Sequence, residues 1–119
     1  MWADQGAGVT YRLQGVFTAI ADPHRRAILD HLAAGELSAG EIAERFAISR
    51  PAVANHLKVL EENRLIRITR RGRMRMHSLD PEGLTTVRDW LNRFDVFWDA
   101  RLDQLKALVE ADTDDPPPE

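Results

Sequence analysis

Two helix-start signals close together in the chain constrain its fold more than any other feature. Ser38 and Glu41 have the spacing of a capping box, in which each side chain accepts a hydrogen bond from a backbone amide at the start of a helix. Ser49 is the next such cap, and Pro51 is tolerated because it falls in the first turn of the helix that follows. The two starts leave room for a short helix and a tight turn between them, which predicts a helix-turn-helix.

Two further helices are predicted before this pair. Apolar residues at helical spacing indicate a helix over residues 9–21. Asp22 followed by Pro23 indicates the cap and the first residue of a second helix, which Gly35 ends.

After Asn63 the apolar period changes from that of a helix to that of a strand. A turn at Arg71 and Gly72 joins two such runs and predicts a β-hairpin. We expect the hairpin to have one arginine-rich face and one apolar face, the latter formed by Ile66, Ile68, Met74 and Met76.

The last predicted helix begins after Asp80 and runs to about Val109, with apolar residues in steps of three and four. The predicted fold is therefore mostly α with a small β-hairpin, in the order α-α-α-α-β-β-α of a winged helix-turn-helix. We expect one domain over residues 9–110. Residues 1–8 and the acidic, proline-rich residues 111–119 are predicted to be disordered.

The charge of the chain is strongly asymmetric, although its net charge is only -3. Residues 45–77 contain nine Lys or Arg and two acids, whereas the remaining residues contain seven basic and seventeen acidic side chains. The basic block coincides with the predicted helix-turn-helix and hairpin, which favours a surface that meets phosphates. Double-stranded DNA is therefore the expected partner, and an acidic protein bound by the same face is the alternative.

The predicted second helix of the motif has one face suited to reading bases. Arg50 can donate to guanine, Asn55 can pair with adenine, and the methyl group of Ala54 can touch a thymine methyl. Ser49 and Lys58 are expected to hold phosphates, which set register without reading sequence. Two neighbours complete the predicted set, Pro51 beside this face and His56, which either touches DNA or completes a hydrogen bond at the edge of the core.

The hairpin that follows is predicted to be the wing. Its arginines are expected to enter a minor groove or to clamp its phosphates. An arginine-rich hairpin alone would be weak evidence, but its place directly after a helix-turn-helix makes it strong evidence. The predicted contact residues are Arg70, Arg71, Arg73 and Arg75.

The sequence resembles the ArsR/SmtB family of winged-helix repressors from about Leu13 to Val109. The segments that carry the resemblance are ADPHRRAIL (21–29), residues 37–46, SRPAVANHLKVL (49–60), the wing and LDPEGL (79–84). The segment FWDARL (97–102) is similar to that of one subgroup. The resemblance implies a homodimer joined through its first and last helices, which binds a palindromic operator and often represses its own operon.

Both metal sites of that family are absent from the sequence. The Cys pair expected around Leu37–Ile42 is missing because the chain contains no Cys, and the segment 81–109 contains no His. His24 and His31 share a helix face near Asp30, but no pair of His has the spacing of a known metal motif. The sequence therefore predicts no metal and no cofactor.

The last helix carries an aromatic set whose simplest role is dimer packing, with a pocket for a small organic ligand as the alternative. The predicted interface residues are Leu13, Val16, Phe17, Leu91, Phe94, Trp98, Leu102 and Leu105. No nucleophile motif, phosphate loop or carboxylate pair suggests an enzyme. No apolar run is long enough for a membrane-spanning helix and no secretion signal is evident, so we expect a cytoplasmic protein without a membrane partner.

Overall fold

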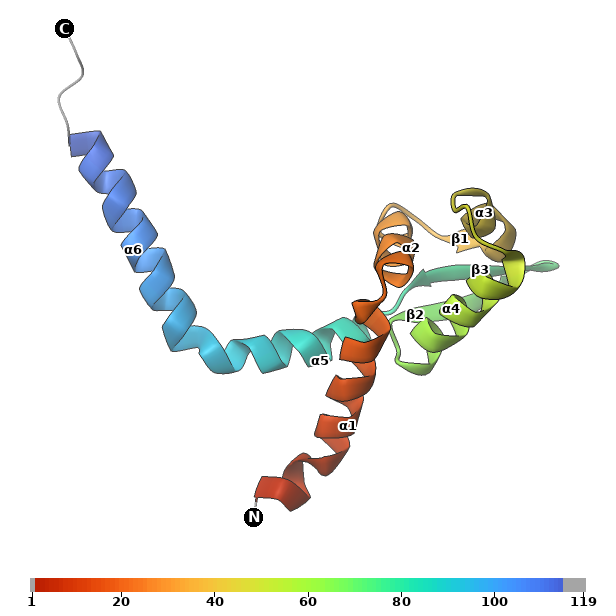
Figure 1. Cartoon of the computed structure of the whole chain (residues 1–119), viewed down its shortest axis with the longest axis horizontal. Coiled ribbons are helices and arrows are strands. Elements are labelled where there is room, and N and C mark those ends of the chain that lie inside the picture. The colour runs from red at the N-terminus through yellow and green to blue at the C-terminus, as the bar shows by residue number, and fades with distance from the viewer. Residues whose placement is uncertain (1, 115–119) are drawn as a thin grey trace, which may run out of the picture. The chain divides into compact units, whose positions relative to one another are not determined.

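A computed structural model describes the backbone of residues 2–114 and the side chains of residues 11–111. By its internal contacts the chain divides into two units, Met1–Arg88 and Asp89–Glu119, and the division falls inside the range predicted as one domain. Figure 1 labels the elements, which in chain order are α1 (Trp2–Ala21), α2 (Pro23–Ala33), β1 (Leu37–Ser38), α3 (Ala39–Glu44), α4 (Arg50–Glu62), β2 (Ile66–Arg71), β3 (Met74–Leu79), α5 (Pro81–Leu91), the 3-10 helix η1 (Asn92–Phe94) and α6 (Asp95–Asp114).

The predicted helix caps are confirmed. Asp22 accepts from the amide of Arg25 at the start of α2, and Ser49 accepts from the amide of Ala52 at the start of α4. The capping box of α3 is complete, because Ser38 Oγ accepts from the Glu41 amide at 3.2 Å and Glu41 Oε1 accepts from the Ser38 amide at 3.0 Å. These local hydrogen bonds fix where each helix of the helix-turn-helix begins.

The sheet has three antiparallel strands in the order β1-β3-β2. The two-residue strand β1 was not predicted, and it attaches the start of α3 to the wing through pairs of Leu37 with His77 and Ser38 with Met76. The hairpin β2–β3 turns through two residues, with Gly72 at a φ of 63°. A glycine at the first central position is the pattern of a type II′ turn, which suits the twist of a hairpin.

The register of the hairpin contradicts the predicted apolar face. Because Arg71 pairs with Met74, Ile68 lies opposite His77 and Thr69 lies opposite Met76. Successive side chains point to opposite faces of a strand, so Met74 and Met76 lie on the other face from Ile66 and Ile68. The prediction that these four residues share one face is therefore wrong.

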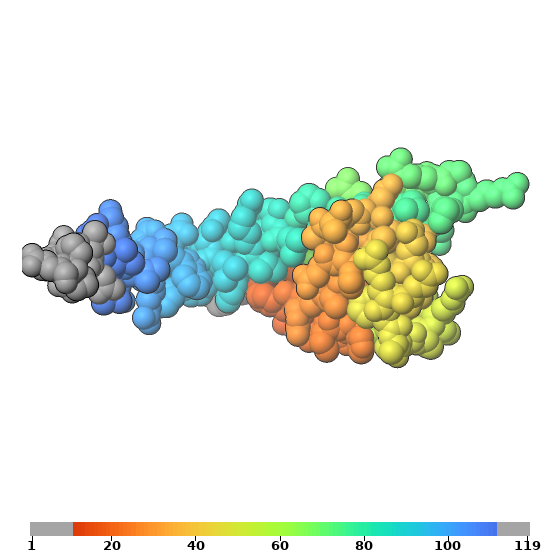
Figure 2. All heavy atoms as spheres, turned by 90° about the horizontal axis from the view of Figure 1, so that it is seen from above, coloured from red at the N-terminus to blue at the C-terminus, as the bar shows by residue number. Residues whose placement is uncertain are grey.

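The core of the first unit lies where α1, α2, α3 and α4 meet the sheet. It contains Ile28 of α2, Ile42 of α3 and Leu60 of α4, all fully buried, together with Leu65 and Ile66 at the start of β2. This packing holds the helix-turn-helix as one rigid body and leaves the hairpin tip free to project beyond it (Figures 1 and 2).

Three boundaries differ from the sequence prediction. Helix α1 begins at Trp2, earlier than the predicted helix start at residue 9, while Met1 lies outside the described residues. The long last helix is interrupted by η1, and α6 then continues to Asp114, beyond the predicted end at Val109. The rest of the predicted disordered tail, residues 115–119, lies outside the described residues.

Within the part of the chain that the structure describes, no helix combines the length and the apolar character needed to cross a membrane.

Candidate nucleic-acid interface

Helix α4 presents two sharply different faces. Val53, Leu57 and Leu60 are buried in the core, as predicted from their spacing. The opposite face is exposed, and it carries the predicted contact residues Ser49, Arg50, Pro51, Ala54, Asn55 and Lys58. Since all six side chains are accessible on one side of one rigid helix, the structure brings together the base-reading and phosphate-holding groups that the sequence suggested.

His56 is the exception in the predicted set. It is half-buried on the side of α4 that packs against α2, and its Nδ1 lies 3.2 Å from Nη1 of Arg25. Because a guanidinium only donates, Nδ1 of His56 is the acceptor of this hydrogen bond. Of the two roles left open for His56, the structure shows the hydrogen bond at the edge of the core.

Arg25 connects three elements and was not singled out by its sequence context. Its Nε donates to the carbonyl of Ala19 at 2.6 Å and its Nη2 donates to the carbonyl of Thr18 at 3.0 Å, near the end of α1. The third bond reaches His56 on α4. One half-buried side chain thus ties α4 to the junction of α1 and α2.

The four predicted wing arginines are all exposed, but they differ in their partners. Nε of Arg71 lies 2.6 Å from Oε1 of Glu36, so its charge is already compensated. Arg70, Arg73 and Arg75 form no ion pair within the part of the chain that the structure describes. The free positive charge of the wing therefore rests on three of the four arginines.

Two of these free arginines stand directly opposite each other. Arg70 pairs with Arg75 in the register of the hairpin, on the same face as Ile68 and His77. Like charges on directly opposed residues of a sheet repel each other and destabilise the pairing. An anion between the two guanidinium groups would remove this repulsion, and a phosphate has the charge and the acceptors to do so.

A groove of about 290 Å³ separates the exposed face of α4 from the wing. Lys58 and Ala54 line it from α4, and Arg75 lines it from β3. Helix α4 and the wing are therefore two walls of one groove, in which Lys58 and Arg75 are joined by one acidic residue, Glu61. Figure 2 shows the hairpin tip as a narrow projection beside the body that carries α3 and the turn before α4.

Two other arginines, Arg64 and Arg67, serve the fold. Arg67 pairs with Asp80 at 3.3 Å, and Arg64 pairs with Glu82 at 3.2 Å. Arg64 also ends α4 at a φ of 57°, a conformation that a residue with a side chain adopts at a cost. These contacts join the end of α4 and the base of the wing to the start of α5.

His77 lies at the base of the wing and is 4% exposed. Its Nδ1 lies 3.2 Å from the carbonyl of Leu37, so this nitrogen carries the hydrogen. Burial lowers the pKa of His77 below 6.5, because a buried imidazolium loses its hydration, and the nearby Arg75 lowers it further. The hydrogen bond with Leu37 and the charge of Glu61 act in the opposite direction without reversing the shift.

Three histidine and aspartate side chains that the sequence did not group together lie close to one another. They are Asp22 at the start of α2, His24 in its first turn and His56 on α4. Burial alone raises the pKa of Asp22, but amide hydrogen bonds from Arg25 and His24, with nearby positive charges, lower this pKa below 3.8 overall. His31, which the sequence suggested as a neighbour of His24, instead contacts Arg45 and Phe46 and is not part of this group.

The predicted dimer residues divide into two groups. Val16 is 2% exposed inside the core of its own unit, so its prediction as an interface residue is wrong, because no surface is left for a partner. Leu13 and Phe17 of α1 are half-buried. The predicted residues of the second unit are all exposed, namely Leu91, Phe94, Trp98, Leu102 and Leu105.

Comparisons with known proteins agree with this architecture. The sequence pattern of a helix-turn-helix domain family matches residues 20–69. The HTH-type transcriptional regulator Rv2034 of Mycobacterium tuberculosis is 42% identical over 107 residues, which cover 89% of this chain and 97% of that protein. The transcriptional repressor SdpR of Bacillus subtilis is 40% identical over 82 residues, which cover 69% of this chain and 91% of that protein.

Solved structures show the same fold. An ArsR-like transcriptional regulator from Rhodococcus sp. RHA1 superimposes with a TM-score of 0.69 at 32% identity, over 85% of this chain and 95% of that chain. The homodimeric winged helix-turn-helix DNA-binding domain of Mb0332 from Mycobacterium bovis superimposes with a TM-score of 0.63 at 25% identity, over 81% of this chain and 86% of that chain. With sequence relatives matched over more than nine tenths of their length and the same fold in solved regulators, the chain belongs to the ArsR/SmtB family of winged helix-turn-helix transcriptional regulators.

Proposed function

We propose that this protein is a homodimeric repressor that binds a palindromic operator through α4 and the wing. The observation that carries the proposal is the exposed face of α4, on which the guanidinium of Arg50, the methyl group of Ala54 and the amide of Asn55 are all accessible. Such a set can distinguish base pairs in a major groove, whereas a plain charge patch cannot. The groove beside Lys58 and Arg75 supports the same assignment, because Arg75, one of the three free wing arginines, lies there next to α4.

The wing supplies contacts that do not depend on sequence. Arg73 lies in the hairpin turn, and the opposed pair of Arg70 and Arg75 gains most from a phosphate placed between them. Arg71 contributes less, because binding DNA would require it to give up Glu36.

Dimerisation is proposed through α1 and the second unit. From Leu91 to Ala111 all side chains are exposed within the single chain, and large apolar residues recur among them. A surface of this kind marks an interaction site in a protein of this size. The homodimeric state of the Mycobacterium bovis structure supports a second copy of this chain as the partner.

Repression is proposed because SdpR, a close relative over most of its length, is named a transcriptional repressor. We further propose that the protein controls its own operon. It would act on DNA in the cytoplasm and catalyse no reaction. A small organic effector at the aromatic residues of the second unit is an extension of this proposal.

The experiment is a fluorescence-anisotropy titration of labelled DNA from upstream of the protein's own gene, at two salt concentrations and against random duplex. We expect tight binding that resists competitor DNA and weakens steeply with salt. Arg50→Ala should cost about 1–3 kcal/mol and relax the preference at one position. Arg73→Ala should weaken binding to all duplexes and reduce the salt slope by about one.

Arg71→Ala is the matched control on the wing, since it removes the same charge beside the same turn from a side chain already paired with Glu36. It should weaken binding less than Arg73→Ala does. Unchanged operator affinity in Arg50→Ala would refute the placement of α4. Binding no tighter than to random duplex, together with binding to an acidic protein, would favour the alternative of a protein-interaction module.

A further inference from the structure

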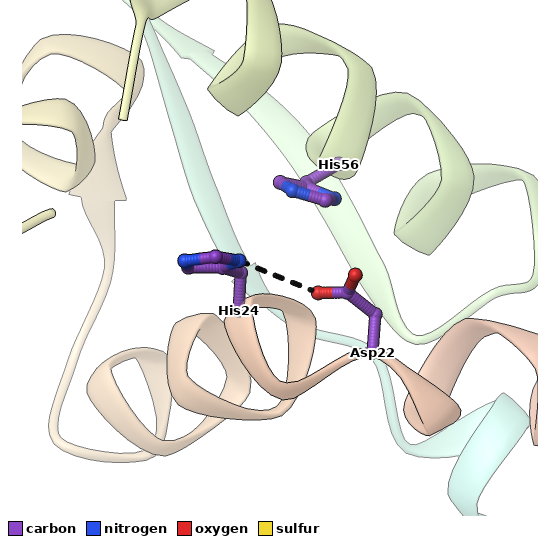
Figure 3. A group of neighbouring side chains, drawn as sticks. All are labelled: Asp22, His24 and His56. Carbon is purple, nitrogen blue, oxygen red and sulfur yellow. Dashed lines mark ion pairs between the residues drawn. The ribbon is translucent and has the colours of Figure 1, made fainter. Parts of the chain in front are cut away.

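The group of Asp22, His24 and His56 joins two helices that the sequence places far apart. Figure 3 shows His24 and Asp22 at the start of α2, facing His56 across the gap to α4. One oxygen or nitrogen from each side chain lies within 4.8 Å of those of the other two. The imidazole rings of His24 and His56 are stacked with centroids 5.7 Å apart, and His24 Nδ1 lies 3.8 Å from Asp22 Oδ1.

We propose that these three residues form a binding site for a divalent transition-metal ion of the zinc class. Two imidazole nitrogens and one carboxylate oxygen are the donors that zinc accepts when three protein ligands leave a fourth position to water. The ligands of the family's usual sites, a Cys pair near Leu37 and His residues in the last helix, are absent from this chain. The site proposed here uses neither location.

To close on an ion, the ring of His24 has to turn out of its stack with His56, so that a nitrogen of each ring and an oxygen of Asp22 converge. Zinc bonds of about 2.0–2.2 Å in a tetrahedron bring ligand atoms to about 3.3 Å from one another. His24 can make this adjustment, because it is exposed in the first turn of α2. Asp22 already accepts an amide hydrogen bond at Oδ1, and a carboxylate can accept such a bond and bind a cation together.

Binding of the ion has a definite consequence for the recognition helix. If the metal binds Nδ1 of His56, this nitrogen can no longer accept the hydrogen bond from Arg25. If the metal binds Nε2, the ring hydrogen moves to Nδ1, where it faces the Arg25 donor and the hydrogen bond is also lost. In both cases the link from Arg25 to α4 ends, and a link from α2 through the metal to α4 takes its place. Arg25 keeps its two bonds to the carbonyls of Ala19 and Thr18.

The position of His56 makes this exchange relevant to DNA. His56 follows Asn55 directly in α4, and Asn55 is exposed on the face proposed to read bases. A metal that changes how α4 is anchored will change operator affinity. This second part rests on the proposed function, whereas the metal site itself does not.

The test of the site is a titration of the full chain with Zn²⁺ in competition with a chromophoric chelator. We expect one ion per chain. His24→Gln, His56→Gln and Asp22→Asn should each weaken binding by more than the roughly 10–100-fold that loss of an outer-shell partner costs. Asparagine preserves the helix cap at residue 22, so this variant removes the charged ligand without removing the cap.

His31→Gln is the matched control, because His31 lies outside the group and contacts Arg45 and Phe46. It should bind Zn²⁺ as the wild type does. Imidazole NMR signals should shift on addition of Zn²⁺ for His24 and His56 and stay in place for His31 and His77. Failure of the wild type to bind Zn²⁺, or binding of Zn²⁺ by His24→Gln and His56→Gln as tight as that of the wild type, would overturn the site.

Operator titrations with and without Zn²⁺ test the coupling. Wild type and His31→Gln should change affinity by roughly fivefold or more, the range of ordinary allosteric coupling, while His24→Gln should not respond. Zn²⁺ binding without any change in operator affinity would overturn the coupling. A protein that binds Zn²⁺ but no operator would instead contradict the proposed function, so the two failures are distinguishable.

Discussion

The two units of this chain use apolar residues in opposite ways. In the first unit, apolar side chains from α1, α2, α3, α4 and the sheet cover one another, and Ile28, Ile42 and Leu60 are completely buried. In the second unit, the described side chains from Leu91 to Ala111 are all exposed, including Trp98 at 45% and Leu102 at 60%.

Regular apolar spacing therefore predicts that a helix face will be buried, but it does not show whether the same chain or a second chain packs against that face. Most of the stability of a protein helix comes from packing of its apolar face rather than from helix propensity. The described side chains of helix α6, Asp95–Asp114, are all exposed and lack such packing. Its cover must therefore come from beyond the unit, and a second copy of the chain is the partner that we propose.

A charge placed on this exposed row should have the largest effect. Leu102→Glu leaves the core of the first unit untouched, because Leu102 belongs to the second unit and is exposed there. We expect the wild type to sediment as a dimer and the variant as a monomer at the same concentration. Loss of two-site binding should lower operator affinity by on the order of 100-fold or more.

Gln104→Glu provides the control for this change. It introduces the same charge two residues away, at a position that is already polar, and should leave both the dimer and DNA binding intact. Circular dichroism distinguishes loss of pairing from loss of the helix. A dimeric Leu102→Glu protein would show that this row of residues does not form the interface.

The next prediction concerns how tightly the first unit is packed. An added Cβ at Gly83 would lie 2.7 Å from the carbonyl oxygen of Asn63 and 2.8 Å from that of Arg64, and the Gly83 amide donates to the same Arg64 carbonyl at 2.8 Å. Since backbone on both sides must move, Gly83→Ala should destabilise the protein by about 1–3 kcal/mol in urea unfolding.

Gly40→Ala is the matched substitution in the first turn of α3. Its Cβ would have only Ser38 Oγ nearby, at 4.0 Å, so the higher helix propensity of alanine should stabilise by up to about 1 kcal/mol. If both alanine variants stabilised the protein equally, the close approach of α5 to the end of α4 would be wrong.

Local signals in the sequence predicted the helix starts well. The caps at Asp22, Ser38 and Ser49 depend on residues at most three positions apart, so the chain itself contains all the information that places them. The exposed face of α4 followed from the same periodicity that placed Val53 and Leu57 in the core.

Features that depend on the number of residues in a turn, or on contacts between residues far apart in the sequence, were not predicted. The faces of the hairpin depend on the length of its turn, and a two-residue turn puts Ile68 opposite His77 rather than beside Met76. Strand β1 is only two residues long, too short for an alternating pattern, and it exists because β3 pairs with it.

The same limit applies to the candidate sites. Exposure of the wing arginines was predictable, but the pairing of Arg71 with Glu36 joins residues from separate elements and has no signal in the sequence. The approach of His24 to His56 likewise depends on how α2 packs against α4. Spacing suggested His31 as the neighbour of His24, because residues seven apart share a helix face.

The smallest predicted effect is a dependence of the free energy of unfolding on pH, caused by His77. It concerns the first unit alone, because the second unit contains no histidine. The pKa of His77 is 6.5 in the unfolded chain and lower in the folded protein. Above 6.5 the imidazole is neutral in both states and its full contribution to stability is present. As the pH falls through 6.5 toward the folded pKa, only the unfolded chain takes up the proton, and stability is lost.

His77→Gln should remove this contribution while keeping an N–H that can donate to the carbonyl of Leu37. The measurement is the free energy of unfolding in urea at several values from about pH 7.5 down to about pH 5.5. The wild type should lose more stability over this range than the variant does, because the other histidines are common to both proteins. Equal losses would mean that His77 takes up its proton as readily in the folded wing as in the unfolded chain, and that its burial in β3 does not lower its pKa.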